Sequence, residues 1–223
     1  MCAGVVLGAG GANSVGLRGM LVLWVLCCLF TGGLWGDEDA AFFWDRPGVT
    51  AGLREHGEVI APDRLARARS WVDEAEHLAS CVTGAVTVVG GSYGCSAAVR
   101  LALARPDLVE RLVLAWPVTA GDPGVERFTR EALGELGAAP EVIDGLLRGD
   151  TLPGVTDAEL HGLGMPVAVV AAVPDNPVHP RRTVDAIKQL TDAVELNSCP
   201  EPPRDGFQAG GFVNDVVQFG LTR

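Results

Sequence analysis

The stretch VTVVGGSYGCSAAV, residues 86–99, places a serine between glycines at the end of an apolar run. Gly90 and Gly94 stand two positions before and after Ser92, and small residues typical of a helix follow. A strand that turns directly into a helix at G-x-S-x-G needs these glycines, because larger side chains would clash in the tight turn. The turn lifts the serine hydroxyl to the edge of a sheet, next to the backbone N–H groups of a helix N-terminus. The stretch therefore predicts a nucleophile elbow centred on Ser92.

The composition is that of a globular chain of one domain. The 223 residues are 48% hydrophobic and 20% charged, which excludes a disordered protein. The formal net charge of -11 disfavours nucleic acid as a partner, because a phosphate backbone attracts clustered Lys and Arg. We predict a Gly-rich leader at residues 1–18 and a single domain at residues 19–223, and the sequence indicates no particular oligomeric state.

Short apolar runs alternate with helix-prone segments, which predicts an α/β fold: a mostly parallel open sheet with helices on both faces. The predicted strands are residues 20–30, 58–62, 85–89, 112–116, 165–173 and 193–196. The predicted helices are residues 47–57, 70–79, 95–104, 183–190 and a closing helix over 213–217. Residues 119–164 contain no strand candidate, so we expect them to form a short helical cap inserted in the domain. Open parallel sheets bind ligands at the carboxyl ends of their strands, where Ser92 is expected.

The most apolar stretch, residues 20–30, allows two interpretations. It is too short for a membrane span, which needs about 20 apolar residues. It has the pattern of a buried parallel strand, which is continuously apolar, and also the length of a signal-peptide core. The strand, which we favour, predicts a cytoplasmic protein, and the signal peptide predicts a secreted one.

No cofactor and no metal site is predicted. The 6 cysteines form no C-x-x-C pair and are not grouped with histidines, as a zinc site requires, and we interpret them as free thiols rather than disulfides. Residues 5–13 resemble the start of a dinucleotide-binding turn, but Asn13 stands where the third glycine of that motif belongs. We therefore favour a flexible leader over a nucleotide site.

Residues 86–116, VTVVGGSYGCSAAVRLALARPDLVERLVLAW, resemble the core of the α/β-hydrolase superfamily. Residues 31–36, TGGLWG, resemble the loop after the third strand of that family, with Gly32 in the place of a common histidine. Because that loop follows a strand in the family, this second likeness is the reason to interpret residues 20–30 as a strand. The resemblance implies a small ester or related acyl compound as substrate, and an oxyanion hole formed by the backbone N–H groups of Leu34 and Tyr93.

The catalytic partners of Ser92 depart from the family pattern. Residues 166–180, PVAVVAAVPDNPVHP, resemble the strand and turn that carry the acid, but Asn176 holds the usual acid position. We assign Asp175 as the acid, with Asp122 as a second candidate. The loop after the last predicted strand, residues 197–211, contains no histidine, although the family places its base there. His179 is the best substitute base, ahead of His161, and its other interpretation is an ordinary loop histidine.

Two functions remain open from the sequence. The first is a serine hydrolase in which Ser92 attacks, His179 accepts the proton and Asp175 orients that base. The second is a catalytically silent protein that binds a ligand in the same pocket. The elbow favours the first, whereas the missing histidine favours the second, because loss of the base lowers turnover about a million-fold in a serine protease.

Overall fold

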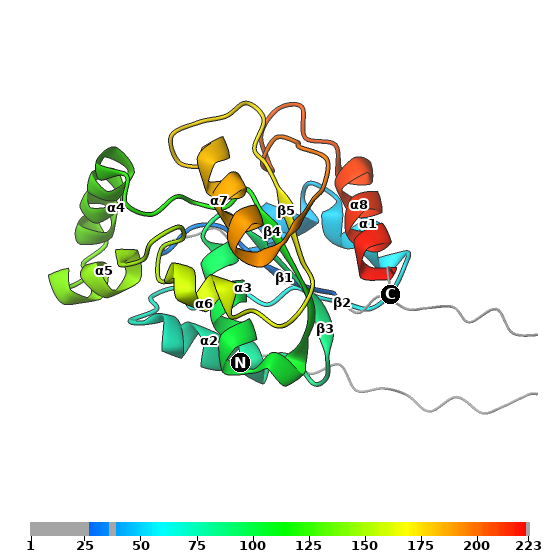
Figure 1. Ribbon diagram of the computed structural model, residues 1–223, viewed down its shortest axis with the longest axis horizontal. Coiled ribbons are helices and arrows are strands. Elements are labelled where there is room, and N and C mark those ends of the chain that lie inside the picture. The colour runs from blue at the N-terminus through cyan, green and yellow to red at the C-terminus, as the bar shows by residue number, and fades with distance from the viewer. Residues whose placement is uncertain (1–26, 36–38, 222–223) are drawn as a thin grey trace, which may run out of the picture.

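The computed structural model describes residues 27–35 and 39–221, and these residues form one parallel sheet covered by helices (Figure 1). All pairs of neighbouring strands are parallel, and the strand order is β2-β1-β3-β4-β5-β6. The strands are β1 (Cys27–Phe30), β2 (Val59–Ile60), β3 (Val86–Gly91), β4 (Val109–Ala115), β5 (Val167–Val170) and β6 (Val194–Glu195). The α/β class and the parallel sheet predicted from the sequence are confirmed.

Helices connect the strands and cover both faces of the sheet. The helices are α1 (Val49–Arg54), α2 (Trp71–Ser80), α3 (Gly94–Ala104), α4 (Pro123–Glu135), α5 (Pro140–Leu147), α6 (Asp157–His161), α7 (Arg181–Thr191) and α8 (Ala209–Leu221). A π-helical turn, η1 (Ala41–Asp45), and a 3₁₀ turn, η2 (Pro106–Leu108), complete the described elements. Figure 1 shows α1 and α8 together on one side of the sheet and α2, α3 and α6 on the other.

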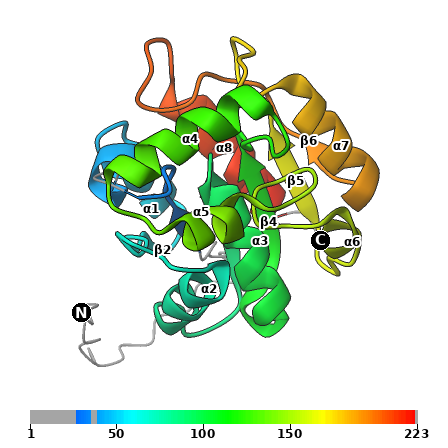
Figure 2. The ribbon, with the colours of Figure 1, turned by 90° about the vertical axis from the view of Figure 1, so that its left-hand side faces the viewer.

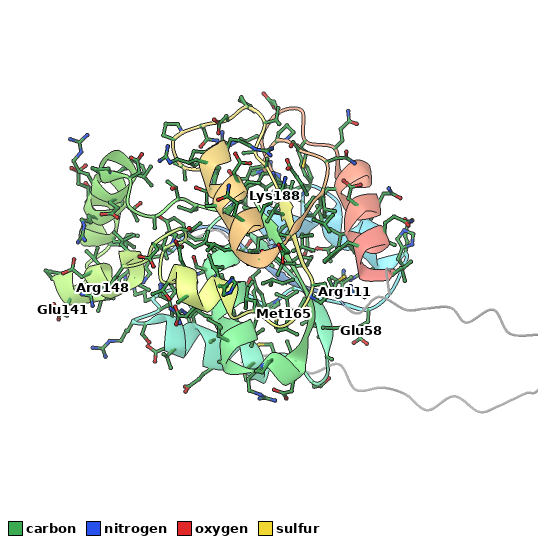
Figure 3. The ribbon with its side chains drawn as sticks, viewed as in Figure 1. Glu58, Arg111, Glu141, Arg148, Met165 and Lys188 are labelled. Atoms are coloured by element: carbon green, nitrogen blue, oxygen red, sulfur yellow. The ribbon has the colours of Figure 1, made fainter. Side chains whose placement is uncertain are left out.

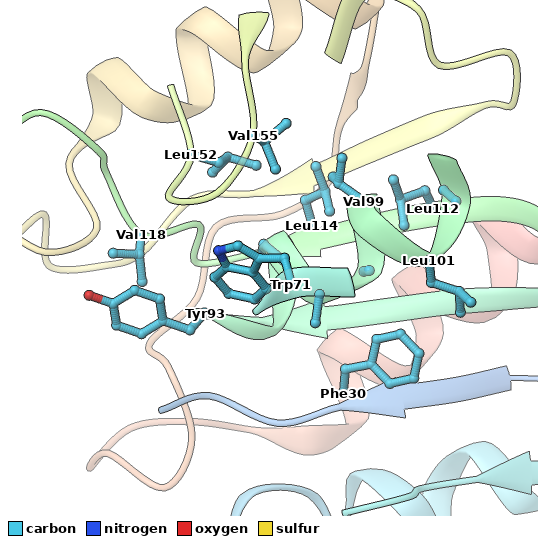
Figure 4. Packing of buried hydrophobic residues seen from close by; sticks show 14 of the residues in the cluster. Phe30, Trp71, Tyr93, Val99, Leu101, Leu112, Leu114, Val118, Leu152 and Val155 are labelled. Atoms are coloured by element: carbon cyan, nitrogen blue, oxygen red, sulfur yellow. The ribbon is translucent and has the colours of Figure 1, made fainter. Parts of the chain in front are cut away.

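The strands divide their side chains between two cores, because successive residues of a strand point to opposite faces. In β3, Val88 belongs to the core beneath α2, α3 and α7, whereas Val89 belongs to the core beneath α1, η1 and α8. Both residues are fully buried, as expected for a parallel sheet covered on both sides. Figure 4 shows part of the first core, in which Trp71 and Tyr93 pack near the end of β3.

An aromatic cluster holds α8 against the second face. Trp116 follows β4, and its ring centroid lies 5.2 Å from that of Phe212 on α8. The Trp44 ring of η1 stacks on Phe212 with centroids 6.1 Å apart and lies 6.3 Å from the Trp116 ring. Trp116 and Trp44 are fully buried, so the cluster fixes the C-terminal helix and the carboxyl end of β4 to each other.

Several charged side chains lie at the periphery of the molecule. In Figure 3, Glu141 and Arg148 extend outward from the two ends of α5, and Glu58 lies at the opposite side of the molecule.

The segment of residues 117–166 between β4 and β5 forms α4, α5 and α6 and contains no strand of the sheet. Figures 1 and 2 show α4 and α5 beyond one end of the strands.

The apolar stretch 20–30 is partly described. Cys27–Phe30 form β1 in the interior of the sheet, which confirms a strand there, and residues 20–26 and the predicted leader lie outside the described residues. No disulfide joins the five cysteines of the described residues to one another. Among residues 27–35 and 39–221, no helix has the length and hydropathy needed to cross a bilayer.

Replacing Gly94 with Ala is expected to destabilise the fold. A Cβ at Gly94 would lie 2.5 Å from the carbonyl oxygen of Thr31 and 2.6 Å from that of Phe30, both backbone atoms that have little freedom to move. We expect a loss of about 1–3 kcal/mol in the free energy of unfolding. Gly145→Ala in α5 is the matched control, because its Cβ meets no atom within 4 Å and alanine favours the helix by about 0.5–1 kcal/mol. Urea denaturation followed by circular dichroism measures both, and equal effects would contradict the steric argument.

Candidate active site

Ser92 sits at a strained turn between β3 and α3. Its φ angle is +53°, a left-handed conformation that is uncommon for a residue with a side chain. Its N–H donates to the carbonyl of Ala115 at 3.0 Å, which ties the turn to β4. A Cβ at Gly90 would lie 2.4 Å from the carbonyl oxygen of Gly94, so the two glycines allow the backbone to pass this closely. The turn therefore has the geometry that the G-x-S-x-G pattern predicts.

His179 contacts the Ser92 hydroxyl directly. Ser92 Oγ and His179 Nε2 are 3.0 Å apart, although 86 residues separate them in the chain. The two residues are only 7% and 5% exposed. His179 lies in the loop between β5 and α7, and its backbone N–H donates to Asn176 Oδ1 at 3.0 Å. The residue at the family's usual acid position thus holds the backbone of the histidine.

The other ring nitrogen of His179 faces a carboxylate from a different loop. Glu201 follows β6, its side chain is 12% exposed, and its Oε2 lies 3.6 Å from His179 Nδ1. This distance is too long for a direct hydrogen bond and short enough for a charge interaction with a protonated ring. Arg204 Nε lies 3.6 Å from the same Glu201 oxygen. Ser92, His179 and Glu201 therefore form one continuous series of contacts.

His179 is a neutral imidazole at neutral pH. Burial, and to a lesser extent the nearby Arg204 guanidinium, lowers the pKa of His179 from 6.5 to about 4. A neutral ring has one nitrogen without a proton, and this nitrogen can accept a proton from the Ser92 hydroxyl. The neutral ring is therefore available as a proton acceptor for the Ser92 hydroxyl.

Asp175 lies apart from this series. Its carboxylate is exposed, and Asp175 Oδ1 accepts a hydrogen bond at 2.8 Å from the backbone N–H of Arg181, the first residue of α7. Asp122 has a similar role at α4, where its side chain accepts hydrogen bonds from the N–H groups of Gly124 and Val125. Both carboxylates satisfy helix N-termini, for which Asp is strongly preferred.

The remaining candidates lie in other surroundings. His161 Nδ1 contacts the Leu190 carbonyl at 3.1 Å on the exposed side of α6. Cys95 is fully buried in the first turn of α3, where its thiol donates to the carbonyls of Gly90 and Ala115. Burial raises the pKa of the Cys95 thiol well above its ordinary value, so it is not a thiolate nucleophile.

Leu34 and Tyr93 lie on the two segments that flank the elbow. Leu34 is buried in the loop after β1, and β1 pairs with β3 in register from Cys27 and Thr87 to Phe30 and Gly90. Tyr93 precedes the first residue of α3, where backbone N–H groups have no acceptor within the helix. The Tyr93 hydroxyl reaches Thr129 of α4 at 3.0 Å, so the residue after the serine also contacts the segment between β4 and β5.

Glu201 is the residue that the sequence analysis did not identify. The signal was present in the sequence: an acidic side chain stands in the loop where the family places its histidine, and a histidine stands in the turn where the family places its acid. The two side chains meet because β5 and β6 are neighbours, which only the pairing of the strands reveals. Among residues 27–35 and 39–221, no group of three or more His, Cys, Asp and Glu side chains is arranged to hold a metal ion.

Comparisons with known proteins agree on the architecture. No protein-family model matches the chain, and no curated protein matches its sequence. Solved structures that match include a meta-cleavage product hydrolase from Pseudomonas fluorescens, with a TM-score of 0.66 and 16% identity over 87% of this chain and 90% of that one. An esterase from a Rhodococcus species matches with a TM-score of 0.62 and 18% identity over 90% of this chain and 92% of that one.

A hydrolase from Pseudomonas aeruginosa matches with a TM-score of 0.64 and 18% identity over 89% of this chain and 91% of that one. These likenesses extend over nearly the whole chain, while the low identities make them evidence of architecture alone. The parallel sheet, the serine at the turn after β3 and these matches lead to the same conclusion. The chain has the fold of the α/β-hydrolase superfamily.

Proposed function

We propose that this protein is a serine hydrolase that cleaves a small ester or a related acyl compound. The observation that carries the proposal is the 3.0 Å contact between Ser92 Oγ and His179 Nε2 at a strained turn. A serine hydroxyl is a weak nucleophile unless an adjacent base accepts its proton, and His179 is both adjacent and neutral.

The reaction proceeds in two halves. Ser92 Oγ attacks the carbonyl carbon of the substrate as His179 Nε2 takes the hydroxyl proton, and the tetrahedral oxyanion collapses when Nε2 returns that proton to the leaving alcohol. Water then attacks the acyl-serine with His179 again as base. A second collapse restores the Ser92 hydroxyl and releases the carboxylic acid. Each half transfers one proton to Nε2 and back, so no cofactor is required.

Glu201 supplies the acid of this site in place of Asp175. The ring becomes positively charged when Nε2 takes the proton, and the Glu201 carboxylate 3.6 Å from Nδ1 stabilises that charge. The same attraction favours the tautomer with the proton on Nδ1, which leaves Nε2 free to act as base. The order of the three residues along the chain is then serine, histidine, acid, with the two partners exchanged relative to the family.

The backbone N–H groups of Leu34 and Tyr93 form the oxyanion hole. Leu34 lies in the loop after β1, Tyr93 directly follows the serine after β3, and these two strands are paired. Donors that are fixed before the reaction stabilise a developing oxyanion without reorganisation, and one such donor contributes about 100- to 1,000-fold in turnover.

Residues 119–164 act as a cap over this site. The contact between Tyr93 and Thr129 connects α4 to the residue after the nucleophile, and Arg182 of α7 pairs with Asp122 at the start of α4 at 2.9 Å.

The esterase and thioesterase named among the matching structures support an acyl substrate. The described cysteines are not joined to one another by disulfides, which suits the reducing cytoplasm that we propose as the compartment.

The second candidate function is a catalytically silent protein that binds a ligand in the same pocket. It was favoured by the absence of a histidine after β6. The position of His179 against Ser92 supports the hydrolase instead, because the base is supplied from the neighbouring loop.

Ser92→Ala and His179→Ala test the nucleophile and the base. We expect the wild type to react with a fluorophosphonate probe and to hydrolyse p-nitrophenyl acetate. Ser92→Ala should abolish both, and His179→Ala should lower turnover by at least about 10,000-fold, because the hydroxyl loses its proton acceptor. His161→Ala is the control and should retain activity. Folded wild-type protein that neither labels nor turns over would support the silent binding protein.

Glu201→Gln and Asp175→Asn distinguish the two candidate acids, since each removes a charge at nearly constant volume. Glu201→Gln should lower kcat by roughly 100- to 10,000-fold, because the protonated ring loses its counter-charge. Asp175→Asn should change kcat less than about threefold and mainly reduce thermal stability, because it loses charge at the N-terminus of α7. Steady-state kinetics with p-nitrophenyl acetate measure both. A larger kcat loss in Asp175→Asn than in Glu201→Gln would reverse the assignment.

The buried neutral His179 makes stability depend on pH. The unfolded chain binds a proton at this residue below pH 6.5, whereas the folded protein does so only near pH 4, so stability is lost as the pH falls through this window. Between pH 7 and pH 5 the free energy of unfolding should fall by about 2 kcal/mol more in the wild type than in His179→Gln. Urea titrations at the two pH values measure this difference. Equal losses in both proteins would show that folding does not lower the pKa of His179.

A further inference from the structure

The loop that carries Leu34 is held by one buried arginine. Arg64 lies between β2 and α2, and its Nη1 donates to the carbonyl oxygen of Gly33 at 2.6 Å and to that of Thr31 at 3.3 Å. The Arg64 side chain is only 6% exposed. A single guanidinium thus binds two backbone carbonyls of the short loop that follows β1.

The bond to Gly33 acts on the same peptide unit that contains the Leu34 N–H. The C=O of Gly33 and the N–H of Leu34 belong to one planar group, and this peptide is trans. In a trans peptide the C=O and the N–H point in opposite directions, so fixing the carbonyl toward Arg64 fixes the N–H away from it. Gly33 has a φ of +69°, a conformation that other residues rarely adopt, so the loop is held in a specific form.

The charge of Arg64 also strengthens the donor. A hydrogen bond from a guanidinium to the Gly33 oxygen polarises the peptide and leaves the Leu34 hydrogen more positive, because hydrogen bonds in series reinforce one another in a low-dielectric interior. A neutral side chain of the same length would position the carbonyl less firmly and polarise it less.

The setting of Arg64 is unlike that of an ordinary surface ion pair. Arg64 Nε donates to Glu74 Oε1 at 2.8 Å, and the Glu74 side chain is completely buried on α2. The guanidinium also lies 5.7 Å from the centre of the Trp71 ring. Burying two charges is expensive, and a buried pair is often no more stable than apolar residues of the same volume. Stability alone is therefore a weak reason for this pair.

We propose that Arg64, fixed by Glu74, is a positioning residue that orients and polarises the Leu34 N–H of the oxyanion hole. The inference rests on the proposed hydrolase function and adds a residue that never touches the substrate. Arg64 acts through the Gly33–Leu34 peptide, and it stabilises the reacting system only when the substrate oxygen becomes negative and accepts the Leu34 N–H.

Arg64→Met and Arg64→Lys test this role in the full-length protein. The probes are p-nitrophenyl acetate, for kcat and KM, and an alkyl trifluoromethyl ketone, which adds to a serine hydroxyl to give a bound oxyanion. Arg64→Met should lower kcat and the ketone affinity by the same factor, about 10- to 100-fold, with KM changed less than about threefold. Arg64→Lys, whose single ammonium cannot reproduce the fork, should lose about 3- to 10-fold in both.

Arg100→Met is the matched control. Arg100 binds the Gly154 carbonyl and Glu159 in the same manner, but these partners lie on the loop and helix before β5 rather than at the elbow. It should lower the melting temperature, while kcat per folded molecule stays within about twofold of the wild type. A purely structural role for Arg64 would give this same result.

The outcomes separate the inference from the function on which it rests. If wild-type protein shows no hydrolysis that depends on Ser92, the proposed function fails and the role of Arg64 fails with it. If the wild type is active and Arg64→Met keeps the wild-type kcat and ketone affinity, the function stands and the positioning role is overturned. If Arg64→Met does not fold, Arg64→Lys decides in the same way, and unchanged kcat and ketone affinity in that variant overturn the role.

Discussion

The backbone turn at Ser92 is the constraint on which the rest of the site depends. A φ of +53° at a residue with a side chain costs of order 1–3 kcal/mol, and the turn persists because its surroundings allow no relaxed alternative. The Ser92 N–H is bound to Ala115 of β4, and Gly94 lies against the carbonyls at the end of β1. Three neighbouring strands thus fix one hydroxyl at the carboxyl edge of the sheet. The positions of His179 and Glu201 in the proposed site are defined relative to this hydroxyl.

The proposed exchange of histidine and acid follows from the way the last two loops are joined. The loop after β5 and the loop after β6 run side by side, linked by a bridge between Ala172 and Cys199 and by the hydrogen bond from the Val173 N–H to the Cys199 carbonyl. Side chains from either loop can therefore face the same space in front of β5. A base from the first loop and a carboxylate from the second give the same sequence of contacts as the reverse assignment. The sheet specifies where the three groups meet, and leaves open which loop supplies which group.

The parts of this structure that follow from local rules were predictable from the sequence. The apolar run before the elbow and the glycines on either side of Ser92 constrain the backbone directly, so the tight turn at Ser92 was correctly predicted. The role of Ser92 as nucleophile stays a prediction. His179 was identified through its position in a loop at the right edge of the sheet. Glu201 was missed because its role depends on contact between two loops 22 residues apart in the chain. Asp175 was favoured as the acid because it is next to Asn176, which holds the usual acid position. In the structure its carboxylate instead accepts a hydrogen bond from the backbone N–H of Arg181 at the start of α7.

Burial links the stability of this site to its chemistry. Removing water from around His179 keeps the ring neutral, which costs folding stability below its unfolded pKa but leaves a base ready at neutral pH. The same exclusion of water strengthens the attraction between an imidazolium and Glu201, and between an oxyanion and the N–H groups beside Ser92. In the role proposed above, the buried Arg64–Glu74 pair extends this arrangement one step from the reacting atoms. Its cost in stability is offset by the fixed orientation of the Gly33–Leu34 peptide. A mutation that admitted water here would weaken several of these interactions at once, because they share one low-dielectric environment.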